Sequence, residues 1–159
     1  PTGQNEVLRL TQNQVGYSYR AVVSYIDSHG TREVLYTSAS ETIDNLDDPV
    51  QGEVTIIGEP KEGVTLRALS NSLSDEDGIA SISISWETSK DGRNWIGLNS
   101  LSGPVLPLNQ TLVGSQVRAR VAVVDNFGIE TNLYSQATRT VENVNNKPSG
   151  RIVIRRVGQ

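Results

Sequence analysis

The chain has 159 residues, a formal net charge of −4 and 36% hydrophobic residues, which is enough apolar content for one domain of ordinary size with flanking segments. Its mildly acidic balance argues against a nucleic-acid partner, because phosphate binding requires clustered Lys and Arg, and no apolar run reaches the roughly 20 residues of a membrane span. Cysteine and methionine are both absent, so disulfides and thiolate chemistry are excluded, and we expect the chain to be part of a longer protein.

Two parts of the sequence resemble each other at a constant spacing of 98 residues. Val15-Gly16 recurs as Val113-Gly114, and Leu35-Tyr36 recurs as Leu133-Tyr134. Both pairs give the same spacing, since 113 minus 15 and 133 minus 35 are each 98, and no gap is needed between them. A period of this length is the size of one β-sandwich domain and is too long for a solenoid unit.

This period divides the chain into three parts. Residues 1–47 are expected to be the second half of one repeat. Residues 48–146 are expected to form a complete repeat, and residues 147–159 the first strand of a following repeat. The chain would then begin and end in the middle of an array.

The complete repeat is expected to contain about seven strands, because short apolar or alternating segments are separated by turn residues throughout. In chain order, the expected strands are 54–57, 64–70, 82–86, 95–98, 105–108, 117–123 and 131–141. No window has a convincing helical period. The predicted fold class is therefore all-β, with seven-stranded immunoglobulin-like sandwiches in tandem. Trp86 lies on the third strand, where such sandwiches bury a tryptophan.

Several short motifs follow one another in a fixed order along the complete repeat. They include Gly52–Ile56, Glu62–Leu66, Leu73–Ile79, Ile84–Glu87 and Asp125–Gly128. As a set, these motifs resemble the immunoglobulin-like (cadherin-like) tandem repeats of large bacterial surface adhesins, biofilm-associated proteins and repeats-in-toxin type exoproteins. Glu87 is a departure, since that family often has Gln after the Trp. The resemblance implies a spacer or display module of a secreted or cell-surface protein, and it implies no particular ligand.

Acidic residues gather in three of the expected loops. The candidate metal ligands are Asp44, Asp47, Asp48, Asp75, Asp77 and Asp125. In an immunoglobulin-like topology these loops meet at one end of the sandwich, and Ca²⁺ requires oxygen ligands of this kind. Calcium would stiffen the joint between repeats, as in cadherin-type arrays. The alternative is that these residues only form turns, in which Asp, Asn and Gly are favoured.

Catalysis is not expected, because no group of residues supports it. His29 is the only histidine, so neither a zinc site nor a hydrolase triad is supported. Glu87 and Asp91 are the best pair for glycosidase chemistry, but they fall on a strand end and a hairpin turn. We therefore expect a protein that is not an enzyme.

Residues 1–47 are expected to hold late strands of a sandwich without the early strands that would cover them. Their apolar side chains, such as Val15, Tyr19 and Val23, cannot be covered by this part of the sequence alone. We expect this part either to exchange strands with another chain, with residues 147–159 as one candidate donor, or to be completed within a longer chain.

The expected function is that of a structural spacer in an extracellular adhesin or filament, secreted or on the cell surface, with neighbouring copies of the same repeat as partners. Two alternatives remain open. One is a carbohydrate- or receptor-binding module, for which Trp95, Tyr17 and Tyr25 are the candidate aromatic contacts to a host or matrix glycan. The other is a phage virion fibre or decoration domain.

Overall fold

The structure is a computed structural model that describes residues 7–155, and it confirms the all-β class. Its described residues contain strands and two single turns of 3-10 helix, with no α-helix. The elements are η1 (Gln12–Gln14), β1 (Val22–Ile26), β2 (Arg32–Tyr36), β3 (Thr55–Ile57), β4 (Thr65–Leu69), β5 (Ile79–Ser89), β6 (Ile96–Ser102), β7 (Val105–Pro107), η2 (Gln110–Leu112), β8 (Gln116–Asp125) and β9 (Glu130–Tyr134).

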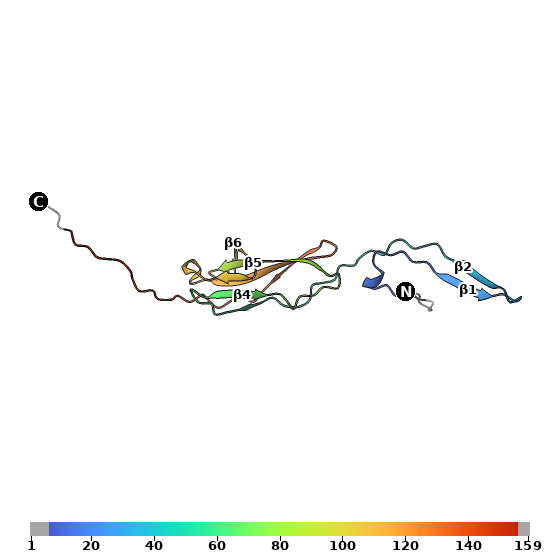
Figure 1. Ribbon diagram of the computed structural model, residues 1–159, viewed down its shortest axis with the longest axis horizontal. Coiled ribbons are helices and arrows are strands. Elements are labelled where there is room, and N and C mark those ends of the chain that lie inside the picture. Colours follow the sequence, from blue (N-terminus) through green and yellow to red (C-terminus); the bar gives the residue numbers. More distant parts are fainter. Residues whose placement is uncertain (1–6, 156–159) are drawn as a thin grey trace.

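In the described residues the strands form three antiparallel sheets, of which the two larger ones pack against each other. β1 and β2 make a separate hairpin, β3-β4-β7 make a three-stranded sheet, and β6-β5-β8-β9 make a four-stranded sheet. Figure 1 shows the hairpin at one end, the two larger sheets in the middle and residues 147–155 running out at the other end.

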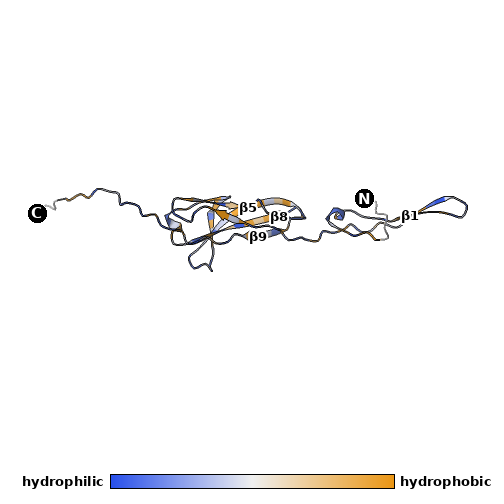
Figure 2. Cartoon of the chain, turned by 90° about the horizontal axis from the view of Figure 1, so that it is seen from below, coloured by the Kyte–Doolittle hydropathy of each residue, from blue (hydrophilic) through white to orange (hydrophobic). Residues whose placement is uncertain are grey.

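The two larger sheets share one hydrophobic core. Residues of β8 alternate between buried and half-buried positions along the whole strand, as expected where one face of a strand is covered. Figure 2 shows apolar residues along β5 and β8. The largest buried side chain is that of Trp86 on β5, and the same core includes Leu66 from β4 and Leu106 from β7. Packing between the sheets therefore holds this part of the chain together without a disulfide.

The last strand is shorter than the sequence predicts. We expected it to span 131–141, but β9 ends at Tyr134. Beyond it, the backbone N–H groups of Ser135 and Thr138 donate to the β8 carbonyls of residues 119 and 117, and Val141 N donates to the carbonyl of Ser115 just before β8. Three residues of this segment thus span two residues of β8, which breaks the regular ladder in the manner of repeated bulges.

Hydrogen bonds in the N-terminal part recur in the complete sheets at the 98-residue spacing. η1 and η2 begin at residues 12 and 110, and β2 and β9 begin at residues 32 and 130. Gly16 N donates to Ile43 O at 2.9 Å, and Gly114 N donates to Val141 O at 3.0 Å. The two segments therefore have the same local backbone structure, although one lies beside a second sheet and the other does not.

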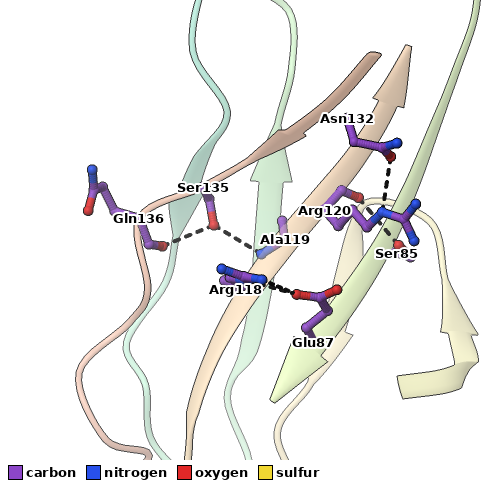
Figure 3. A network of polar contacts seen from close by, with 8 residues as sticks. All are labelled: Ser85, Glu87, Arg118, Ala119, Arg120, Asn132, Ser135 and Gln136. Carbon is purple, nitrogen blue, oxygen red and sulfur yellow. Dashed lines mark hydrogen bonds and ion pairs between the residues drawn. The ribbon is translucent and has the colours of Figure 1, made fainter. Parts of the chain in front are cut away.

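One recurring contact involves a hydroxyl at the end of the last strand. Figure 3 shows the hydroxyl of Ser135, which accepts from Ala119 N at 2.9 Å and donates to Gln136 O at 2.9 Å. In the N-terminal part, the Thr37 hydroxyl accepts from Ala21 N at 3.0 Å. The Ser135 contact is buried and the Thr37 contact is exposed, so water can replace only the second hydroxyl.

This difference predicts unequal effects of the same kind of substitution. Ser135→Ala leaves the buried Ala119 N–H without its side-chain acceptor and should cost about 1–3 kcal/mol of unfolding free energy. Thr37→Ala should cost less than about 0.5 kcal/mol, because an exposed N–H finds water. Urea unfolding of the full chain measures both. Equal losses of unfolding free energy in the two variants would show that burial does not determine how much each hydroxyl contributes to stability.

Candidate functional site

Three of the six candidate metal ligands come together where the chain passes from residues 7–47 into the larger sheets. Asp47, Asp77 and Asp125 each offer a carboxylate oxygen, and these oxygens all lie within 4.8 Å of one another. We call these three residues the acidic cluster. No other group of three or more acidic or histidine side chains is so placed in the described part of the chain.

The other three candidates lie outside the acidic cluster. Asp44 is exposed and contributes no oxygen to it. The carboxylates of Asp48 and Asp75 are also outside it, although both are near enough to act on Asp47 electrostatically. The backbone of Asp48, rather than its side chain, takes part in the site, since Asp48 N donates to Asp77 Oδ2 at 3.1 Å.

Asp125 is held in place by the turn between β8 and β9. Its Oδ1 accepts from Phe127 N at 2.9 Å and from Ile129 N at 2.7 Å, the side-chain-to-backbone pattern for which Asp is favoured in turns. The residue is only 4% exposed, and its Oδ2 is buried with no hydrogen-bond partner. One oxygen therefore forms the turn, and the other is left free for a ligand.

Asp77 is positioned by the loop that leads into β5. Asp75 Oδ1 accepts from Asp77 N at 2.8 Å and so shapes this loop. Gly78 has φ +81°, a backbone conformation that favours glycine, and a Cβ there would displace the side-chain amide of Asn126. Asp77 is 4% exposed, and its Oδ1 has no partner although it is buried.

The acidic cluster concentrates negative charge without a basic neighbour. Loss of contact with water, followed by the charges of Asp125 and Asp77, raises the pKa of Asp47 above 3.8. Within residues 7–155, the one ion pair joins Arg118 to Glu87, so no Lys or Arg neutralises the cluster. Buried carboxylate oxygens without partners are costly, and a cation would satisfy them.

The donor set fits a hard divalent cation better than a transition metal. It consists of carboxylate oxygens with no nitrogen or sulfur, which is the chemistry that Ca²⁺ prefers. Ca²⁺ takes about six to eight oxygen ligands, so carbonyls or waters would have to complete the set. At Asp125, forming a turn and binding an ion are compatible, because one oxygen forms the turn and the other is unpartnered.

Trp95 and Tyr25, two of the candidate aromatic contacts, lie in different parts of the fold. Trp95 is half-buried, and the guanidinium of Arg118 lies 4.3 Å from the ring centroids of both Trp95 and Tyr134. Arg118 also pairs with Glu87 at 2.7 Å (Figure 3). This stack binds Trp95 to the outer face of the four-stranded sheet, while Tyr25, the exposed aromatic of β1, belongs to the N-terminal hairpin.

Asp91 forms the turn between β5 and β6. Its Oδ1 accepts from Asn94 N at 2.8 Å and from Arg93 N at 2.9 Å, and its Oδ2 accepts from the Asn94 amide at 2.6 Å. The two backbone donors and the Asn94 and Ser89 side chains lower the pKa of Asp91 well below 3.8. The carboxylate is thus a structural acceptor.

This lowered pKa predicts a pH-dependent contribution to stability. The folded state keeps Asp91 ionised to lower pH than the unfolded chain does, so its stabilisation is present above the ordinary pKa of 3.8 and is lost as the pH falls toward the lowered value. We expect Asp91→Ala to lower the melting temperature at neutral pH, with a difference from wild type that narrows between about pH 4 and pH 2. The neighbouring variant Lys90→Ala should show no such narrowing, and a pH-independent difference for Asp91→Ala would contradict the assignment.

A shallow cleft of about 430 Å³ lies between β3 and the segment 136–139. Its charged lining residues are Glu53, Glu59 and Arg139, all of which are exposed. It contains no buried titratable group, so it is a weaker candidate for a site than the acidic cluster.

No family model matches this sequence, and no curated protein or solved structure is significantly similar to it. Among residues 7–155, the structure has no helix with the length and apolar character needed to cross a membrane.

Proposed function

We propose that residues 48–146 are one immunoglobulin-like repeat of a tandem array, and that the array is a spacer in a secreted or surface-displayed adhesin or filament. The observation that carries this proposal is the recurrence of the same turns, strands and hydrogen bonds 98 residues apart. A protein that repeats a whole structural unit in line gains length with each unit, which is what a spacer requires.

The arrangement of the strands supports the immunoglobulin-like assignment. Strand orders β3-β4-β7 and β6-β5-β8-β9 divide the complete repeat between two sheets with a shared core, the general plan of such sandwiches. Trp86 lies in this core on the strand expected for it. The resemblance to bacterial surface repeats adds the extracellular setting, which is part of the proposal.

The acidic cluster suggests how neighbouring repeats would be held in line. Asp47 belongs to the segment that enters the repeat, whereas Asp77 lies in the loop before β5 and Asp125 is the last residue of β8. A Ca²⁺ ion bound by all three would cross-link the entering segment to the repeat and stiffen the joint. At the next joint Asn145 stands 98 residues after Asp47, so calcium should bind there more weakly.

Small-angle X-ray scattering from chains with one, two and three tandem copies of residues 48–146 tests the spacer role. We expect the maximum dimension to increase by an equal step with each added copy, because each copy contacts only its neighbours. Copies that fold back on one another would give a maximum dimension that lags behind the copy number, and this result would contradict the proposal.

A further inference from the structure

The N-terminal part presents apolar side chains at positions that are buried in the complete repeat. We call Leu8, Leu10, Val23 and Tyr25 the acceptor face; they are between 48% and 53% exposed. The residues 98 positions further on are at most 3% exposed. They are Leu106, Leu108, Val121 and Val123.

What covers these buried counterparts is visible in the complete repeat. Their core also contains Val54 just before β3, Leu66 and Ala68 from β4, and Trp86 from β5. All four of these residues lie within 48–104, immediately before β7 in the chain. At the 98-residue spacing, residues 7–47 correspond to residues 105–145. The equivalents of residues 48–104 would precede residue 7, where the structure describes no residues.

Within residues 7–155, the N-terminal hairpin also has an unpaired strand edge. β8 pairs with β9 on one side and with β5 on the other, whereas β1 pairs only with β2 in this part of the chain. The register of β1 and β2 matches that of β8 and β9, since Val22 opposes Tyr36 as Arg120 opposes Tyr134. The edge and the acceptor face are therefore shaped for a strand like β5 and a sheet like the one that includes β4.

We propose that the acceptor face binds a polypeptide segment with the strand pattern of residues 48–104, joined in cis ahead of Val7. Its strand equivalent to β5 pairs with the free edge of β1. Its strand equivalent to β4 pairs with residues 7–9, as β4 pairs with β7, and covers Val23 and Tyr25. This inference rests on the proposed tandem array. Residues 147–155 are a poorer occupant, because they correspond to 49–57 and supply only the equivalent of β3.

The test is an extended chain in which a second copy of residues 48–104 is joined directly to residue 7, compared with the full 159-residue chain. Hydrogen exchange is measured at residues 19–36 and at their counterparts 117–134. We expect exchange at 19–36 to slow by about 100-fold or more in the extended chain and to approach that at 117–134, because a covered, paired strand opens only with the unit around it.

Val23→Asp in the extended chain is the matched control, and it should abolish the added protection by placing a charge in the new core. Unchanged exchange at 19–36 in the extended chain would overturn the inference. This holds even if the added copy of 48–104 were itself unprotected, because the same sequence folds within the complete repeat of the same molecule. Protection at 19–36 in the unextended chain, together with sedimentation as a dimer, would show that a second copy covers the face and would also overturn it. In either case, protection at 117–134 and equal scattering steps would leave the spacer proposal standing.

Discussion

Replacing Trp86 with alanine should remove about 3–5 kcal/mol from the unfolding free energy of the complete repeat. The side chain is fully buried in the core shared by the two larger sheets. Its Nε1 donates to Gly103 O at 3.0 Å, so the substitution leaves both a cavity and a carbonyl without its partner. A loss of this size is a large fraction of the roughly 5–15 kcal/mol that stabilises an ordinary domain.

Urea unfolding followed by circular dichroism measures this loss without relying on tryptophan fluorescence. Trp95→Ala is the matched control, because it removes the same side chain from a half-buried position over Arg118. Its cost should be about 1 kcal/mol. Similar losses for the two variants would contradict the placement of Trp86 as the centre of the core.

Calcium should stabilise the chain through the acidic cluster. Extracellular calcium modules have dissociation constants of about 0.1–1 mM, so about 5 mM Ca²⁺ should add about 1–2 kcal/mol of unfolding free energy. For a unit of this size, that gain corresponds to a rise of several degrees in melting temperature relative to EDTA. The physical reason is the pair of buried, unpartnered oxygens on Asp77 and Asp125.

The double variant Asp47→Asn, Asp77→Asn should abolish the stabilisation by calcium. In EDTA it should be at least as stable as wild type, because it removes like charges that crowd one another. In Ca²⁺ it should gain nothing. Asp44→Asn is the matched control from the same linker segment, since Asp44 lies outside the cluster, and it should keep the full calcium response. An equal response in all three chains, or none in wild type, would leave these aspartates as turn-forming residues only.

The sequence predicted the strands well wherever one face of a strand is buried. β8 is the clearest example, because its apolar residues alternate without interruption. The end of β9 was missed for a physical reason: residues 135–141 stay beside β8 but advance three residues for every two of β8. A pattern with period two cannot reveal that change of spacing.

The candidate site could be predicted only in part. Residue type and loop position identified the three aspartates of the cluster, but did not separate them from Asp44. Asp44 precedes Asp47 by three residues, and an extended chain covers about 10 Å in that interval, which takes its carboxylate out of reach. The close approach of Gly78 to Asn126, which brings the two loops together, is a contact through space that spacing along the chain does not reveal.

The modular organisation is tested most directly by unfolding residues 48–146 as a separate polypeptide. Every residue of the hydrophobic core, from Val54 to Val141, lies within this segment. We therefore expect it to fold alone and to unfold in urea in a single cooperative transition, with a midpoint close to that of the same region in the full chain. A segment that is unfolded by itself, or that folds only when residues 7–47 are attached, would contradict the account of the chain as a series of independent repeats.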